Sequence, residues 1–329
     1  MREPASSHGR FFPQGLFLLG EEHFSKEVPQ LAEAMCDMVH PDVYAVEVGP
    51  NAARYVSGLL KSSGRMTRMQ ERGRQYPSSM AFLDIKEENE LAAHCAASSH
   101  NSGFELWGLD QEFVGAAGML LDAMLATHPG PRSHRAILQA QLQERKAESA
   151  ARAAGQVELL FLLASSDAEL SPLEQAVAAD GNTETRSIFR EFMDSRRIYQ
   201  MHLQGLPDSN RVRAELLKRH FMAAYTNFKQ RSPQPHVFIK FGAMHTGKGF
   251  SFLHQRDLGN FIAEQADLEQ AQSLHVLVLG ARGVHFYPTG YGKTTVPQPF
   301  NLTTDAQWGW FNPACNNRFP KRLEYLRRL

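Results

Sequence analysis

The chain has 329 residues, and its 35 basic and 35 acidic side chains cancel to a formal net charge of zero. This balance excludes the broad positive field that favours nucleic acid or an anionic membrane surface, so we expect no nucleic-acid partner. The length exceeds that of a usual single core, which favours one large α/β domain with an insertion, or two domains.

The cysteine count and the hydropathy bear on the compartment. Cys36, Cys95 and Cys315 are an odd number without a Cys-x-x-Cys pair, which predicts neither a disulfide framework nor a thiolate zinc site. The amino terminus lacks the apolar core of a signal peptide, and no run of about 18 apolar residues could span a bilayer. We therefore expect a cytoplasmic protein in a reducing compartment, with no transmembrane segment; a periplasmic protein whose leader had been removed would look the same.

The first third of the chain alternates short apolar runs with helical patterns. The runs are "LFLLG" at 16–20, "VYAVEVG" at 43–49 and "FELWGLD" at 104–110. Segments of 3.6-residue periodicity lie between them, which predicts strand, helix, strand units of a parallel sheet. We expect the first helix to begin after Ser25, with Pro29 in its first turn, where a missing N–H costs no hydrogen bond.

A helical segment interrupts this pattern between residues 133 and 231, where Ala, Gln, Glu and Arg dominate. One helix start is predicted at "SPLE" (171–174), which combines a serine cap, a proline and a glutamate. Strands return with "HVFIKFG" at 236–242 and "LHVLVLG" at 274–280, before a proline-rich tail of extended connections from Gly283. The predicted fold is α/β, a mainly parallel sheet flanked by helices, with residues 1–132 and 232–329 as the catalytic core and 133–231 as an inserted helical cap.

Ionisable residues follow the predicted strands at their carboxyl ends, where ligands bind in open parallel sheets. They are Glu21, Glu22 and His23 after the first strand, Glu47 in the second, Asp110 after the third, and His245 and Lys248 after the fourth. Each of these taken alone is more typical of a surface loop. Glu47 is the exception, because its neighbours Val46 and Val48 would face one side of a covered strand and leave its carboxylate buried on the other. It therefore needs a cation, a metal ion or a water network.

The pattern G-x-x-H occurs twice, as "GEEH" at 20–23 and "GAMH" at 242–245, each directly after a predicted strand. Glycine lets the chain turn sharply at the strand end, so that the histidine can lie back over the sheet. Two histidines and a carboxylate at neighbouring strand ends could ligate a metal ion, or could supply a base, an orienting acid and an electrophile for hydrolysis.

These paired motifs, with an acidic residue at the second strand and an arginine on an intervening helix, resemble the superfamily of erythromycin esterases, Tiki and TraB proteins and ChaN-type haem-binding proteins. The start "LGEEH" is most similar to the ChaN-type "LGExH", whereas erythromycin esterases usually have one more residue between glycine and histidine. The resemblance implies catalytic roles for Glu21, His23, Glu47 and His245. Asp110 resembles the end of the "fGxD" pattern of the esterase-like members.

The arginine of this resemblance is assigned from helical position. On the predicted helix 210–228, Arg213 lies on the apolar stripe four residues before Leu217, where a guanidinium needs an anionic partner or reaches out to solvent at the edge of the cap. Arg213 is therefore the first choice, and Arg219, which points more toward solvent, is the reserve. We assign Asp110, Glu22, Lys248 and Arg219 to substrate binding.

The leading functional hypothesis is a hydrolase acting on an ester or amide of a small molecule or peptide. In its metal-free form His23 acts as general base, Glu21 or Glu47 orients it, and His245 with Arg213 stabilises the oxyanion. In its metal-dependent form His23, Glu47 and His245 hold a divalent metal ion that activates water. The alternatives are a haem- or metal-binding protein of the ChaN type without hydrolytic activity, and a domain that keeps the fold without the chemistry. The sequence does not predict an oligomeric state.

Overall fold

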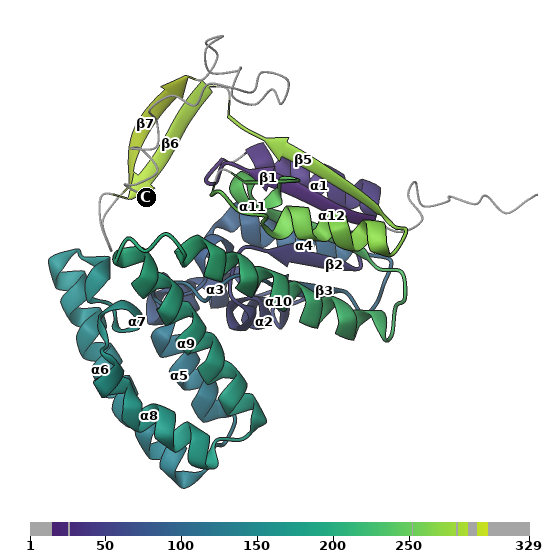
Figure 1. Ribbon diagram of the computed structural model, residues 1–329. Coiled ribbons are helices and arrows are strands. Elements are labelled where there is room, and N and C mark those ends of the chain that lie inside the picture. The colour runs from purple at the N-terminus through teal and green to yellow at the C-terminus, as the bar shows by residue number, and fades with distance from the viewer. Residues whose placement is uncertain (1–14, 26, 252, 281, 289–294, 302–329) are drawn as a thin grey trace, which may run out of the picture.

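The computed structural model describes residues 15–25, 27–251, 253–280, 282–288 and 295–301. Its centre is a five-stranded sheet in which all pairs are parallel and the strand order is β3-β2-β4-β1-β5 (Figure 1). The strands are β1 (Gly15–Glu21), β2 (Val43–Val46), β3 (Glu105–Gly108), β4 (His236–Gly242) and β5 (Gln272–Val278). All five predicted strands are confirmed, and so is the parallel sheet.

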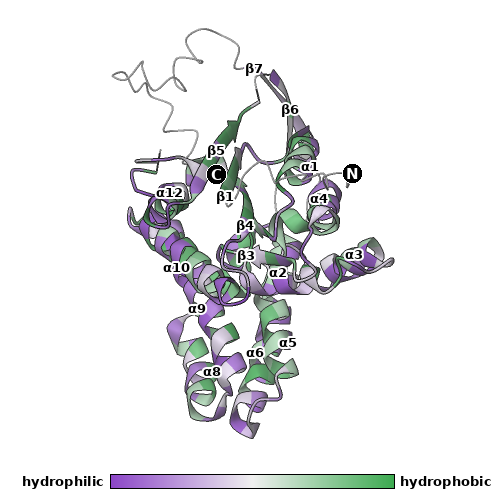
Figure 2. Ribbon diagram, turned by 90° about the vertical axis from the view of Figure 1, so that its right-hand side faces the viewer, coloured by the Kyte–Doolittle hydropathy of each residue, from purple (hydrophilic) through white to green (hydrophobic). Residues whose placement is uncertain are grey.

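Helices cover both faces of the sheet, and the strands are mainly hydrophobic (Figure 2). Their buried apolar side chains belong to two core clusters, one on each face. Phe17 and Leu19 of β1 pack toward α1 (Glu27–Val39) and α4 (Lys86–Ser98), which we call the α1/α4 face. Leu16 and Leu18 pack toward α10 (Ser209–Lys229) and α12 (Leu258–Leu268), the α10/α12 face. This alternation follows from the two-residue period of a strand.

The remaining helices connect these layers or form the helical insertion. Before and after β3 lie α2 (Pro50–Ser57), α3 (Arg65–Gln75), the 3-10 turn η1 (Ala81–Asp84) and α5 (Ala117–Ala126). The insertion continues with α6 (Pro131–Ala154), η2 (Val157–Leu159), α7 (Phe161–Ala164), α8 (Asp167–Asp180) and α9 (Thr183–Leu203), and the short α11 (Ala243–Thr246) follows β4.

Helices α6, α8 and α9 extend away from the sheet at the lower left of Figure 1. The last helix of the insertion, α10, instead lies on the sheet through Leu217, Phe221, Tyr225 and Phe228. The segment between β3 and β4 is therefore helical as predicted, and its final helix also belongs to the α/β core. This helix connects the insertion to the strand ends.

Two local predictions are wrong. Helix α8 begins at Asp167 rather than at "SPLE", because Ser166 and Glu169 form the capping box and Pro172 lies inside the helix. In the tail, β6 (Arg282–Pro288) and β7 (Thr295–Asn301) pair antiparallel, although extended connections were expected. Prolines are tolerated there because each strand of a two-stranded ribbon has an open edge.

The cysteine prediction is also corrected. Cys36 on α1 and Cys95 on α4 are joined by a disulfide with a Cα–Cα distance of 5.3 Å. The two helices are adjacent on one face of the sheet, but the cysteines are 59 residues apart in sequence, so spacing gives no sign of the pairing. Cys315 lies outside the described residues. Within the described residues no helix is long and apolar enough to cross a membrane.

Candidate active site

The candidate residues converge at the carboxyl ends of β1, β4 and β2, around the carboxylate of Glu47. Its Oε2 accepts a hydrogen bond of 2.5 Å from the backbone N–H of Gly242, and its Oε1 accepts one of 2.8 Å from Arg213 Nη2. The side chain is buried and lies on the side of β2 opposite Val46 and Val48, as the strand alternation predicts. Glu47 is thus a buried anion held between cations and a backbone donor.

Arg213 projects from α10 into the space between Glu47 and Asp110. Its Nε donates to Asp110 Oδ1 at 2.9 Å, and its Nη2 donates to Asp110 Oδ2 as well as to Glu47. Burial lowers the pKa of Arg213, but the carboxylates of Asp110 and Glu47 outweigh it and raise the pKa above its usual value. The third guanidinium nitrogen, Nη1, makes no hydrogen bond among the described residues, which leaves it able to bind an oxygen.

His23 lies between two carboxylates at the open side of the site. Its Nδ1 is 3.1 Å from Glu21 Oε1, its Nε2 is 3.4 Å from Glu47 Oε2, and a quarter of the side chain, 25%, is exposed. Burial lowers the pKa of His23, but Glu47 and Glu21 outweigh it and raise the pKa to about 9. The imidazole is therefore a strong base that carries a proton at neutral pH.

His245 approaches Glu47 from the other side and is buried. Its Nε2 is 3.7 Å from Glu47 Oε1, and its Nδ1 donates to Asp257 Oδ2 at 3.0 Å. Asp257 also accepts from the backbone N–H of Leu258, the first residue of α12. Burial raises the pKa of Asp257, and its bond to His245 outweighs this and lowers it. His245 and Asp257 form the hydrogen-bonded pair in which a carboxylate fixes the orientation of an imidazole.

The positive groups around Glu47 keep it ionised. Burial alone would raise the pKa of this carboxyl, but His23, His245 and Arg213 hold it well below its usual range. Gly242 gives the cluster its close approach, because a Cβ at this position would come within 2.8 Å of His23 Nε2 and 3.2 Å of Glu47 Oε2. The close approach of His23 and Glu47 therefore requires a glycine in the second G-x-x-H motif.

Besides Asp257, sequence reasoning missed two ionisable residues that contact this cluster from the α1/α4 face of the sheet. Lys240 of β4 donates to Glu21 Oε1 at 2.5 Å and to Glu88 Oε1 of α4 at 2.8 Å, and all three side chains are buried. A lysine inside the apolar run "HVFIKFG" is the signal that could have identified it, because it shares the period of Phe238 and must face the covered α1/α4 face.

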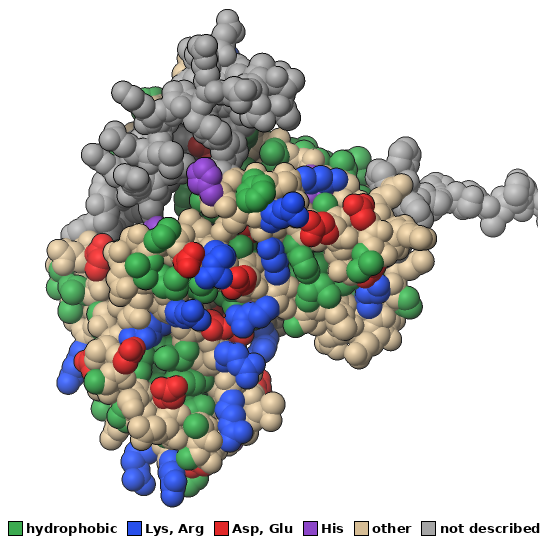
Figure 3. Space-filling view, in the orientation of Figure 1, with side chains coloured by type: hydrophobic (Ala, Val, Ile, Leu, Met, Phe, Trp, Pro, Cys, Tyr) green, Lys and Arg blue, Asp and Glu red, His purple; other side chains and the backbone are tan. Residues whose placement is uncertain are grey.

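Three predicted substrate-binding residues lie at the margin or away from the cluster. Glu22 is half-buried in the loop between Glu21 and His23, and Lys248 is exposed beyond α11. Arg219, with 60% of its side chain exposed, pairs with Asp194 at 2.9 Å. On the face of the molecule that Figure 3 shows, acidic and basic side chains are interspersed. Arg213 rather than Arg219 is therefore the arginine at the site.

An aromatic pair forms the rim beside His23. Phe82 of η1 stacks on the His23 ring with centroids 4.1 Å apart, and Phe24 lies 5.8 Å from Phe82 and is 47% exposed. Phe24 has a φ of 70°, in the left-handed region that a bulky side chain rarely adopts. The exposed Phe24 ring thus leaves an apolar surface beside His23.

The predicted metal set does not fit a metal centre. In the described part of the chain, no group of three or more His, Cys, Asp and Glu side chains is arranged to hold a metal ion. Both oxygens of Glu47 already accept hydrogen bonds, and the guanidinium of Arg213, 2.8 Å away, would repel a divalent cation. Arg213 already supplies positive charge beside Glu47.

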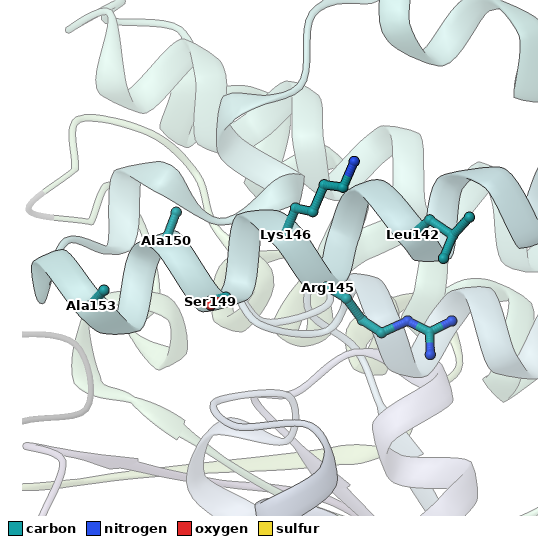
Figure 4. Close-up of a pocket in the computed structure, with 6 residues that line it drawn as sticks. All are labelled: Leu142, Arg145, Lys146, Ser149, Ala150 and Ala153. Carbon is teal, nitrogen blue, oxygen red and sulfur yellow. The ribbon is translucent and has the colours of Figure 1, made fainter.

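A hollow also lies on the exposed face of α6, in the helical insertion. Its lining residues all come from that helix, as Figure 4 shows: Leu142, Arg145, Lys146, Ser149, Ala150 and Ala153. Among them there is no carboxylate or imidazole that could pair with the two cations for acid–base chemistry. The strand ends therefore remain the candidate site.

Comparisons with known proteins address the fold. No protein-family model and no curated protein matches the sequence. A mutant of erythromycin esterase EreC, solved in its open conformation, superposes with a TM-score of 0.51 at 13% identity, over 89% of this chain and 79% of that one. A succinoglycan biosynthesis protein and a protein from Bacillus cereus both give a TM-score of 0.47 at 14% identity, over 89% of this chain and 74% and 72% of theirs. The similarity to EreC confirms the predicted fold class: this chain has the α/β fold of that esterase.

Proposed function

We propose that this protein is a metal-free hydrolase that cleaves an ester or amide at the carboxyl ends of β1, β4 and β2. The observation that carries the proposal is the convergence of His23, His245 and Arg213 on the single buried carboxylate of Glu47. A base, a fixed imidazole and a guanidinium around one anion are the parts that acyl transfer to water requires. The esterase fold of EreC supports the reaction class.

In the proposed reaction His23 acts in its neutral form, which predominates above its pKa of about 9. Its Nε2 takes a proton from a water molecule while Nδ1–H stays bonded to Glu21. The hydroxide adds to the carbonyl carbon, and the resulting oxyanion is stabilised by Arg213 Nη1 and by His245, whose orientation Asp257 fixes. The tetrahedral intermediate then collapses, the bond to the alcohol or amine breaks, and the leaving group takes the proton from His23. The products are a carboxylic acid and an alcohol or amine.

The rim favours substrates with an apolar group near the scissile bond. The Phe24 ring lies 6.2 Å from the His23 ring and is open to solvent, so an alkyl or aromatic part of a substrate would pack against it as the carbonyl reaches His23. Erythromycin itself is not implied, because the G-x-x-H spacing at residues 20–23 differs from that usual in erythromycin esterases.

A panel of 4-nitrophenyl esters and anilides of increasing acyl length tests the proposal, with native protein, His23→Gln and His245→Asn assayed after chelator treatment. We expect hydrolysis by the chelated native protein and loss in both variants. Turnover that is absent from the whole panel, or is equal in all three proteins, would overturn the proposal. Hydrolysis that requires an added metal ion would instead support the metal-dependent form of the hydrolase hypothesis.

Haem binding is the second function implied by the ChaN-type resemblance, and no contact among the described residues favours it. The cavity that adjoins His23 measures about 10 Å³, far smaller than a porphyrin. Titration with haemin distinguishes the two functions, since a saturable Soret shift that is lost in His23→Gln would support haem binding.

A further inference from the structure

A buried polar group lies under His23, on the α1/α4 face of the sheet. It consists of Lys240 on β4, Glu88 on α4 and Tyr44 on β2, together with Glu21 at the end of β1. The proposed reaction assigns no role to Lys240, Glu88 or Tyr44. A lysine with 3% of its side chain exposed is costly in a core unless it is paired, so the arrangement is unlike an ordinary sheet interior.

Charge and hydrogen bonding connect this group to His23. Lys240 donates to the same oxygen, Glu21 Oε1, that lies 3.1 Å from His23 Nδ1. Its second bond goes to Glu88, so one ammonium group balances two carboxylates. Burial raises the pKa of Glu88, and Lys240 acts in the opposite direction. Removing the charge of Lys240 or of Glu88 would therefore leave the remaining charges unbalanced in a region without bulk water.

A cavity of about 10 Å³ lies among these side chains, and it is lined by Glu21, His23, Tyr44, Glu88 and Lys240. This volume holds one water molecule. Two buried oxygens on its wall, Tyr44 Oη and Glu21 Oε2, have no hydrogen-bond partner among the described residues. The phenol is a donor and the carboxylate oxygen an acceptor, so one water molecule between them would satisfy both.

We propose that one water molecule occupies this cavity, where it accepts a hydrogen bond from Tyr44 and donates one to Glu21. Together with this water, Lys240 and Glu88 are positioning residues that hold Glu21 against His23. As regards catalysis, this inference rests on the proposed hydrolase function. When Glu21 is held in this position, it keeps a proton on His23 Nδ1 and orients Nε2 toward Glu47 and the open side of the site.

Two charge substitutions in opposite directions test the positioning role. His23 is faced directly by Glu21, Glu47, Phe82 and Phe24, and at longer range by Glu88, Lys240, Arg213 and His245. Glu88→Gln removes a negative charge and should move the titration midpoint of the His23 ring, followed by NMR, down by about half a pH unit or more. Lys240→Met removes a positive charge and should move it up, and the double variant should lie near the native protein.

Glu90→Gln is the control, because it makes the same change on α4 at a side chain that is 45% exposed and pairs with Lys86, and it should leave the midpoint unchanged. Equal midpoints in all variants, or shifts of Glu88→Gln and Lys240→Met in the same direction, would overturn the positioning role. If Lys240→Met does not fold, Glu88→Gln and the charge-balanced double variant decide the question. None of these measurements needs a substrate, so they distinguish failure of this inference from failure of the proposed hydrolysis.

Tyr44→Phe tests the water molecule. Loss of a phenol that donates to a bound water should lower the Tm, whereas loss of an unsatisfied buried hydroxyl should leave the Tm unchanged or raise it. A crystal structure should show the water within hydrogen-bond distance of Tyr44 Oη and Glu21 Oε2. A dry cavity, or a Tyr44→Phe variant as stable as the native protein, would contradict the water.

Discussion

The two G-x-x-H loops have the same spacing but place their histidines in different surroundings. His23 is a quarter exposed, stacked on Phe82 and set between Glu21 and Glu47, whereas His245 is buried and bonded to Asp257. Both imidazoles point Nε2 toward Glu47. One spacing therefore supports two roles: a histidine that can reach water and exchange a proton, and one whose orientation is fixed by a carboxylate.

Removal of His23, the partly exposed histidine, should have the largest effect. We expect His23→Gln to lower kcat on an activated ester by about 10² to 10⁴, the range for loss of a positioned general base. Steady-state kinetics measure this, with His94→Gln as the matched control, because His94 also bonds a carboxylate, that of Asp37, but on the surface. If kcat fell equally in His23→Gln and His94→Gln, His23 would have no special role as a base.

Removal of the fixed histidine should have a somewhat smaller effect. We expect His245→Asn to lower kcat by about 10² to 10³, as expected for loss of an oxyanion donor. Asp257→Asn should lower kcat by about 10- to 100-fold, because His245 stays in place but loses its orienting charge. If Asp257→Asn has native kcat while His245→Asn is inactive, the pair does not act as a unit.

The first loop should make the stability of the protein depend on pH through His23. The pKa of His23 is raised above 6.5 to about 9 in the folded protein, so its contribution is fully present below pH 6.5 and is lost as the pH rises through 9. We expect the free energy of unfolding to fall by about 3 kcal/mol over this range through His23. Denaturant titrations of native protein and His23→Gln measure the difference; parallel pH profiles would contradict the raised pKa.

The smallest expected effect concerns the rim, which only the first loop has. Phe24→Ala should raise KM for long-chain esters by roughly tenfold and leave KM for acetate esters nearly unchanged, because the ring contacts only the apolar part of a substrate. Leu142→Ala on α6, which removes another exposed apolar side chain, is the control. A rise in KM that does not depend on chain length would argue against an apolar contact at Phe24.

The sequence determines the positions of the strands because each is a short apolar run, and all five lie within a few residues of the expected ranges. Arg213 was found because a charge on the apolar stripe of a helix must meet an anion, and it lies against Glu47 and Asp110. Glu47 was found by the same reasoning on a strand. A buried charge can therefore be predicted from sequence when it interrupts the apolar pattern of a helix or strand.

Contacts between residues that are far apart in sequence could not be predicted. Asp257 lies in a loop 12 residues beyond His245, and Glu88 lies 152 residues before Lys240, so no spacing connects either pair. The disulfide between Cys36 and Cys95 was missed for the same reason. Lys240 itself carried a signal, a cation at a strand position that faces a covered layer, but its partners appear only when α4 is packed on the sheet.

The pH–rate profile of ester hydrolysis tests the central claim most directly, namely that His23 serves as the base of a metal-free site around Glu47. With chelator-treated native protein, kcat/KM should rise with pH to a plateau above an apparent pKa of about 9, and this ionisation should be missing in His23→Gln. A rate that falls over the same range, or a profile that His23→Gln leaves unchanged, would contradict the account.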